Sequence, residues 1–268
     1  MIKKLQRNAR NVAFALRAGV KLRDKLTLTW MLMKHIAVNR GWMGFSGEPT
    51  TITAQHDGRT FAVQLRDNAT DIIIFEDIFQ QRCYELPETA FANIVDAGAN
   101  IGLASLYLSL AHPGADIVSF EPVEHVMCKR NAAHVFDFAL GKTPGMVNIL
   151  IDPNNSGGHR LEIYDSDPGL RRLEVSVHRL DQLIADGTIA APDLLKIDAE
   201  GAECDILEGL GEHLKTLRTL VAETQSHANH KWIIERLRAA GFTRIEERIL
   251  HPDASLPSDA FSIIVAQR

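Results

Sequence analysis

The sequence predicts an α/β fold in which a mostly parallel sheet is covered by helices on both faces. Three observations predict it. From Asn93 onward, short apolar runs alternate with runs of helical periodicity. The stretch 93–102, NIVDAGANIG, passes from an apolar run through a glycine turn into such a periodic run. A second apolar run, Ile117–Phe120, ends in the acid Glu121. We therefore expect a ligand site at the carboxyl ends of the strands.

The individual elements follow from the same patterns. Apolar runs predict strands at 93–97, 116–120, 134–139, 192–198, 218–223, 242–248 and 261–267. Helical spacing predicts helices at 101–111, 124–131, 203–214 and 229–240. The alternation fails in the insertion 145–180, where strands are expected at 147–151, 160–164 and 173–177. We interpret this insertion as a substrate lid, and an ordinary β extension is the alternative.

Residues 1–47 form a predicted basic helical arm. Apolar residues from Ile2 to Val20 recur at three- and four-residue steps, which is typical of an amphipathic helix. A second apolar stretch, 26–38, is too short to span a bilayer and is interrupted by Lys34 and His35. The arm is interpreted as a helical cap or homodimer contact, or as a basic helix lying on a membrane surface.

Composition and charge narrow the class of protein. The 268 residues are 46% apolar and 24% charged, which is ordinary for a soluble protein. The arm holds ten Lys or Arg and one acid, so the remaining chain is strongly acidic, and no nucleic-acid partner is predicted. Three widely spaced cysteines and the lack of a signal-peptide pattern indicate a cytoplasmic protein, with peripheral membrane association as the alternative.

The glycine turn predicts a nucleotide-like cofactor. Gly98 and Gly102 let the main chain approach a ligand, and the following helix presents unpaired N–H groups. The dinucleotide fingerprint would need glycines at the positions of Asn100 and Leu103, which counts against NAD. An acid in the position of Glu121 can accept hydrogen bonds from both ribose hydroxyls, so adenosine is expected.

Four motifs together resemble one family. VDAGANIG, FEP, LLKIDAEGAECDILEGL and LVAET occur in the order found in the FkbM family of S-adenosylmethionine-dependent methyltransferases. The resemblance covers roughly residues 71–223. It implies a Rossmann-like class I methyltransferase sheet with an antiparallel last strand, formed here by residues 91–268. Within residues 48–90, the sequence predicts strands at 51–56 and 60–65 that form a hairpin around Asp57-Gly58. The resemblance implies that the segment 71–87, which follows the hairpin, covers the cofactor.

The turn chemistry and the resemblance together assign the cofactor S-adenosyl-L-methionine to one set of residues. The expected contacts are Tyr84, Glu85, Asp96, Gly98, Asn100, Gly102, Glu121, Pro122, Ala139 and Asp198. The chain departs from the family at Lys142, where an acid is frequent. The helix that follows Pro122 is also short.

Candidate catalytic residues follow two neighbouring strands. Asp198 and Glu200 come directly after one strand, and they could orient an acceptor hydroxyl, accept its proton, cap the next helix or hold a divalent cation. An acid pair falls short of a full oxygen shell, so no metal site is predicted. Glu223 ends the next strand. The family often has a histidine two residues after this glutamate, where this chain has Gln225. Either His227 is therefore the base, or the base is not a histidine.

These features predict an O-methyltransferase. The expected acceptor is a hydroxyl of a sugar, a glycan or a polyketide-like natural product, and the expected partner is therefore a small molecule or glycan. Two alternatives stay open. One is an NAD-dependent oxidoreductase on a similar sheet, and the other is a catalytically silent adenosylmethionine-binding scaffold that acts through its basic arm.

Overall fold

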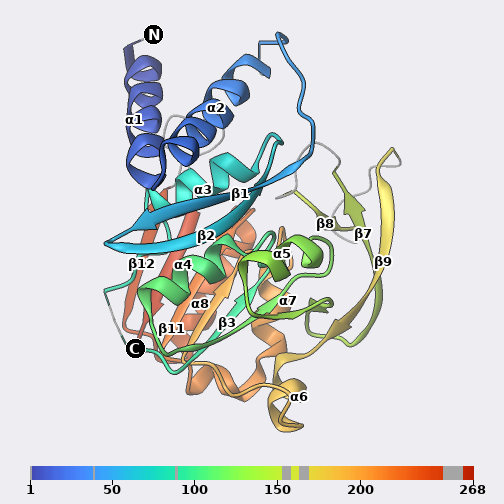
Figure 1. The fold of residues 1–268 in the computed structure, drawn as a ribbon. Coiled ribbons are helices and arrows are strands. Elements are labelled where there is room, and N and C mark those ends of the chain that lie inside the picture. Colours follow the sequence, from blue (N-terminus) through green and yellow to red (C-terminus); the bar gives the residue numbers. More distant parts are fainter. Residues whose placement is uncertain (1, 39, 88–89, 153–157, 163–168, 250–261) are drawn as a thin grey trace. The chain divides into compact units, whose positions relative to one another are not determined.

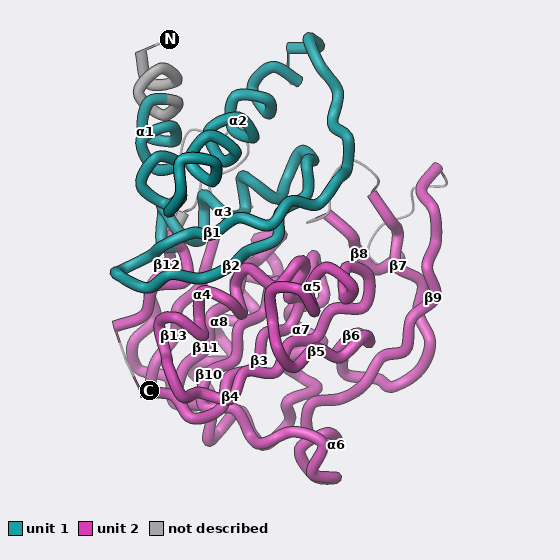
Figure 2. Tube along the Cα trace, in the orientation of Figure 1, with its two compact units in different colours: residues 1–82, 154–156 teal, residues 83–153, 157–268 magenta. Residues whose placement is uncertain are grey.

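A computed structural model describes residues 2–38, 40–87, 90–152, 158–162, 169–249 and 262–268. The chain forms two compact units that divide after Arg82 (Figure 2). The first unit contains the described residues up to Arg82, and the second contains those from Cys83 onward. Each unit is described by itself.

The first unit combines helices with one β-hairpin. Its elements are α1 (Ile2–Ala18), α2 (Leu22–Val38), β1 (Pro49–His56), β2 (Arg59–Arg66) and α3 (Asp71–Phe79). The predicted hairpin is confirmed. Its turn residues Asp57 and Gly58 have φ values of 46° and 76°, as a tight turn between antiparallel strands requires.

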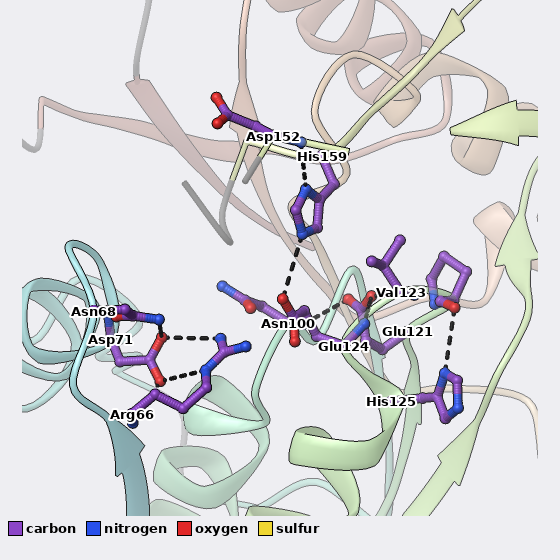
Figure 3. Close-up of polar contacts among 11 residues, drawn as sticks. Arg66, Asn68, Asp71, Asn100, Glu121, Val123, Glu124, His125, Asp152 and His159 are labelled. Atoms are coloured by element: carbon purple, nitrogen blue, oxygen red, sulfur yellow. Dashed lines mark hydrogen bonds and ion pairs between the residues drawn. The ribbon is translucent and has the colours of Figure 1, made fainter. Parts of the chain in front are cut away.

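Helix α3 was not predicted, because a nine-residue helix gives too short a periodic pattern. Its first residue, Asp71, is buried and accepts hydrogen bonds from the side chains of Arg66 and Asn68 (Figure 3). Phe75 of α3 lies between the rings of Phe14 and Phe79, with ring centroids 5.6 and 4.8 Å away. Charge pairing and aromatic packing thus hold this helix in the first unit.

The second unit is built on a seven-stranded sheet (Figure 1). Its strand order is β12-β13-β11-β10-β3-β4-β5. The bounds are β3 (Asn93–Ala97), β4 (Asp116–Phe120), β5 (His134–Phe136), β10 (Leu194–Ile197), β11 (Thr219–Thr224), β12 (Arg244–Ile249) and β13 (Ser262–Gln267). The strands from β11 to β5 are parallel, and β13 runs antiparallel between β11 and β12. The predicted sheet with an antiparallel last strand is confirmed.

Helices cover both faces of this sheet. α4 (Leu103–Ala111) and α5 (His125–Asn131) lie on one face, and α7 (Glu203–Gly209) and α8 (His227–Ala239) lie on the other (Figure 1). From β3, successive strands are added toward one edge of the sheet, which ends at β5. From β10, they are added toward the opposite edge. The carboxyl ends of β3 and β10 therefore flank the topological switch point, where doubly wound sheets bind ligands.

Two predicted elements differ from the structure in how they are divided, and a second helix besides α3 was not predicted. The expected strand 134–139 is two strands, because β5 joins the main sheet while β6 (Ala139–Leu140) joins another. The expected helix 203–214 ends at Gly209 and continues as the 3₁₀ helix η2 (Gly211–Lys215), since Gly211 has a φ of 59°. The six-residue helix α6 (Leu180–Ala185) was not predicted.

The insertion forms a separate four-stranded sheet in the order β6-β9-β7-β8. Its strands β7 (Gly145–Ile151) and β9 (Arg171–His178) pair antiparallel, and β8 (Arg160–Leu161) pairs with β7. Several predicted positions lie outside the described residues. These are 154–157 and 163–168 in the insertion, and the loop that contains Pro252 and Pro257.

Candidate functional site

The turn after β3 brings the ends of β3 and β10 together and contains a buried hydrogen-bond acceptor. Gly98, Asn100 and Gly102 all have positive φ, at 76°, 49° and 84°. A Cβ at Gly98 would overlap the carbonyl oxygen of Asp198, so only glycine allows this contact between the ends of β3 and β10. The Oδ1 atom of Asn100 is buried and accepts no hydrogen bond from the described part of the chain. A ligand donor at this turn would satisfy it.

Glu121 closes the same turn from the end of β4. One carboxylate oxygen accepts the backbone N–H of Asn100 at 2.7 Å (Figure 3). The other accepts the N–H groups of Val123 and Glu124 at 2.8 and 2.9 Å. Burial raises the pKa of Glu121, and these backbone donors oppose that shift. The carboxylate thus fixes both flanking loops, and the oxygen that faces Asn100 keeps lone-pair capacity for a further donor.

Asp96 has an internal role in the structure. It is fully buried, with one oxygen 2.9 Å from the ammonium of Lys196 and the other accepting from the hydroxyl of Ser105. Lys196 also donates to the carbonyl of Gly98 at 2.8 Å. The pair therefore holds the glycine turn in place, and this is how the structure connects Asp96 to the candidate cofactor site.

Tyr84 lies beside the end of β10. Its hydroxyl donates to Asp198 at 3.2 Å, and the ammonium of Lys196 lies 5.6 Å from its ring centroid. Burial, followed by the charges of Asp198 and Glu223, raises the pKa of Tyr84, so the phenol stays protonated. The neighbouring Glu85 is exposed, and its carbonyl accepts from Arg248 at 2.7 Å.

Pro122 and Ala139 lie near the edge strand β5. The carbonyl of Pro122 accepts from His125 at 3.3 Å, which stabilises the turn into α5 (Figure 3). Ala139 pairs with Val177 in the insertion sheet. Aromatic rings from this region pack together with centroids 5.2–5.5 Å apart: Phe120, Phe136 and Phe138. An apolar surface therefore adjoins the end of the strand that carries Glu121.

Glu200 is an acid with a raised pKa at this edge of the sheet. It has a φ of 48° in the turn that follows Asp198. Burial, and then the charges of Asp198 and Glu203, raise the pKa of Glu200 to about 8, while Arg160 opposes the shift. A carboxyl with this pKa can accept and return a proton near neutral pH, which is what general acid–base chemistry requires.

Glu203 fixes the turn that carries Glu200. It is fully buried and accepts from the N–H of Gly201 at 2.7 Å and from the side chain of Asn229 at 2.9 Å. Asn229 also donates to the carbonyl of Gly201 at 3.3 Å. This network links the start of α7 to the start of α8, and it pre-organises the acidic turn.

The two histidines after β11 differ in environment. His227 is exposed at the first position of α8, and Glu223 before it is half-buried. His230 is buried, and its ring nitrogens bond to Ser262 at 2.8 Å and to Glu247 at 2.9 Å. His230 therefore stabilises the packing of α8 on the sheet, and His227 is the histidine with access to solvent.

The insertion contacts the loop that follows β4. His159 accepts the backbone N–H of Asp152 at Nδ1, 3.2 Å away, so its proton lies on Nε2, which donates to Glu124 at 3.3 Å (Figure 3). Lys142, where the family often has an acid, forms ion pairs with Asp205 and Glu208 on α7. Lys142 therefore faces α7, away from the turn at Glu121.

The structure brings most predicted site residues to one edge of the sheet. Gly98, Asn100 and Glu121 meet at one corner, and Tyr84 and Asp198 meet at the adjacent strand end. Three residues that contribute to this edge were missed: Lys196, Glu203 and His159. Lys196 could have been found, because it stands two residues before Asp198 and so faces the same side of the strand. In the described ranges, no cluster of three His, Cys, Asp or Glu side chains is arranged for a metal ion.

The fold and this edge define the class: a Rossmann-like α/β protein with its candidate site at the switch point of the sheet. The model of the Methyltransferase FkbM domain matches residues 96–244. That range is more than half of the chain, so the protein belongs to the FkbM methyltransferase family. The family resemblance predicted from the four motifs is confirmed, and family membership assigns a methyltransferase.

Curated relatives agree with this assignment. Methyltransferase sdnD of Sordaria araneosa is 31% identical, and the match covers 73% of this chain and 89% of sdnD. The 31-O-demethyl-FK506 methyltransferase FkbM of Streptomyces tacrolimicus is 29% identical, over 65% of this chain and 83% of that one. The hexuronic acid methyltransferase AglP of Haloferax volcanii is 22% identical, over 54% of this chain and 61% of AglP.

Proposed function

We propose that this protein transfers a methyl group from S-adenosylmethionine to a hydroxyl oxygen of a sugar, a glycan or a polyketide-like natural product. One observation carries the proposal. A turn with a buried, unsatisfied acceptor at Asn100 lies at the end of β3, and the acids Asp198 and Glu200 follow the adjacent strand β10. A cofactor corner and proton-accepting groups therefore share one edge of the sheet.

The residues at the corner fit an adenosyl group. The Glu121 carboxylate can accept further hydrogen bonds from ribose hydroxyls, and the buried Oδ1 of Asn100 can accept one from the ligand. Gly98 allows the backbone carbonyl of Asp198 to approach closely, so the ends of β3 and β10 meet at this corner. When bound, adenosylmethionine supplies a methyl group activated on a sulfonium.

The acids supply the remaining chemistry. Glu200, with its pKa near 8, accepts the proton of the acceptor hydroxyl. Asp198 is fixed by a hydrogen bond from Tyr84, and it orients the acceptor hydroxyl. Glu223 and His227 line the acceptor side. Holding the two reactants in line supplies about 7–11 kcal/mol of the barrier reduction, so a single moderate base is sufficient.

The names of two relatives support the acceptor class. FkbM of S. tacrolimicus is named for the 31-O position of FK506, and AglP is named for a hexuronic acid. Both names are consistent with an oxygen acceptor on a small molecule or a sugar. The insertion, as a lid, would select among such acceptors.

Two measurements test the proposal. Calorimetric titration reports binding of adenosylmethionine, and isotope-labelled methyl groups report transfer to a panel of sugars, glycans and hydroxylated polyketides. We expect the wild type to bind and transfer. Glu200→Gln should bind the cofactor within about threefold of wild type and lose at least roughly 100-fold in kcat.

Glu208→Gln is the matched control, because Glu208 lies on the outer side of α7 beside Lys142. Glu208→Gln should keep the cofactor affinity and the kcat of the wild type. Failure of the wild type to bind adenosylmethionine would overturn the proposal. Binding with no transfer to any acceptor in the panel would favour the silent scaffold.

A further inference from the structure

Helix α2 has an apolar stripe that its own unit leaves uncovered. Leu22, Leu26, Trp30 and Met33 are 71%, 58%, 54% and 49% exposed. At about 100° per residue, these positions fall within an arc of roughly 80° on one side of the helix. The residues that α2 buries, such as Leu28 and Met31, lie on the other side. The stripe is therefore a second apolar face, distinct from the core-facing one.

The exposed apolar surface extends to both sides of α2 along the chain. Eight of the ten large apolar side chains exposed in the described part of the chain fall between residues 16 and 43. They include Leu16 and Val20 before α2 and Trp42 after it. A concentration of this kind marks an interaction surface, since scattered exposed residues would spread over the whole protein.

Cations border the stripe. Arg17, Lys21 and Arg23 are exposed, and Lys25 is half-buried. The single acid of this segment, Asp24, is buried and accepts the backbone N–H of Lys21 at 3.1 Å. The accessible charge around the stripe is therefore positive.

We propose that α2 and its flanking residues, 16–43, dock this protein on the surface of an anionic phospholipid membrane. The apolar stripe would enter the boundary between headgroups and acyl chains, with Trp30 and Trp42 at the interface that tryptophan prefers. The bordering cations would face the acidic headgroups. A second copy of the chain is a less suitable partner for the stripe, because the cations that border the two stripes would repel each other in a symmetric dimer. None of the described helices is long and apolar enough to cross the bilayer.

Vesicle flotation with the full chain tests this proposal. The vesicles are phosphatidylcholine alone and phosphatidylcholine mixed with phosphatidylglycerol. Wild-type protein should float with the mixed vesicles, and added salt should weaken the binding. The variant Leu26→Gln/Trp30→Gln should bind at least roughly tenfold more weakly. Loss of each cation should weaken vesicle binding about fivefold. The variant Lys21→Glu/Arg23→Glu/Lys25→Glu should therefore bind at least roughly 100-fold more weakly.

The control is Val126→Gln/Met146→Gln, which removes two equally exposed apolar side chains from the second unit, at 60% and 58% exposure. It should bind like wild type. Absence of vesicle binding, or equal binding to neutral vesicles, would overturn the proposal. Sedimentation without vesicles completes the test, because a dimer that Leu26→Gln/Trp30→Gln dissociates would assign the stripe to a second copy instead. Methyl transfer to a soluble acceptor should stay unchanged in the variants of Leu26 and Trp30 and in those of the three cations, so the result is independent of the proposed activity.

Discussion

The ammonium of Lys196 lies 2.9 Å from the carboxylate of Asp96, and both side chains are buried between adjacent parallel strands in direct register. The same ammonium donates to the carbonyl of Gly98. One ion pair thus joins β3, β10 and the glycine turn. The geometry of the candidate cofactor corner depends on a charge pair that itself faces no solvent.

Removing the cation should destabilise the protein more than removing both charges. In Lys196→Met, the carboxylate of Asp96 stays buried without its counter-charge, which costs about 3–5 kcal/mol of unfolding free energy. Adding Asp96→Asn should recover part of this loss, because a neutral amide can still accept from Ser105. Urea denaturation of the three proteins measures this. A Lys196→Met protein as stable as wild type would contradict the assigned role.

Cofactor affinity should depend on Glu121. In Glu121→Gln, the amide nitrogen would face one of the backbone N–H groups that the carboxylate now accepts. We expect affinity for adenosylmethionine to fall at least about tenfold, the cost of one unsatisfied polar contact. Calorimetric titration measures the change. Glu124→Gln, three residues later, is the matched control and should bind within about threefold of wild type, since its side-chain oxygen can still accept from His159. Equal affinity of wild type and Glu121→Gln would remove Glu121 from the cofactor site.

The rate of methyl transfer should rise with pH up to about 8, because the pKa of Glu200 is raised to about 8 and only its ionised form accepts a proton. In Glu200→Gln this rise should disappear together with most of kcat. His227→Gln should keep the rise, since His227 is exposed at the start of α8. Log kcat against pH for the three proteins is the measurement. Loss of the pH dependence in His227→Gln alone would transfer the role of base to His227.

The same carboxyl predicts a stability effect of defined sign. The pKa of Glu200 is about 8 in the folded protein, against 4.5 ordinarily. Its contribution to stability is therefore fully present below about pH 4.5 and is lost as pH rises through about 8. Glu200→Gln should accordingly gain stability relative to wild type as the pH is raised from 5 to 9. Urea denaturation at both pH values checks this, and an unchanged difference would show that Glu200 has an ordinary pKa.

His159 should hold the insertion against the loop after β4. Asparagine can replace Nδ1 as acceptor toward Asp152, and glutamine can replace Nε2 as donor toward Glu124. We expect His159→Ala to raise KM for the acceptor roughly tenfold, because the insertion loses its fixed position. His159→Gln should retain more acceptor affinity than His159→Asn, since only glutamine keeps the link between the two segments. The cofactor dissociation constant should stay within about threefold of wild type in all three. An unaltered acceptor KM in His159→Ala would show that this contact does not position the insertion.

The central sheet was predictable because its inner strands are short, mostly apolar runs that are buried on both faces. Leu194–Ile197 is buried at every position, and such runs are typical of parallel strands covered on both faces. The glycine turn was predictable for a different reason. Gly98 and Gly102 adopt positive φ, which few other residues tolerate, so their spacing in the sequence indicates a tight turn.

The parts that were missed depend on contacts between distant segments. His159 and Glu124 are 35 residues apart, and no local pattern indicates that they meet. The division of residues 134–140 into two sheets is set by pairing of Ala139 with Val177, far along the chain. The ion pair between Asp96 and Lys196 was missed, because the two residues lie 100 positions apart and nothing in the segment around Asp96 indicates that they meet.

The most direct test of the central claim is a crystal structure of the protein with bound S-adenosylhomocysteine, the methyl-transfer product of the cofactor. We expect the ribose hydroxyls to lie within hydrogen-bond distance of the Glu121 carboxylate. We also expect the homocysteine sulfur to face Asp198 and Glu200. An adenosyl group bound away from the turn at 98–102, or a Glu121 carboxylate that makes no contact with the ribose, would contradict it.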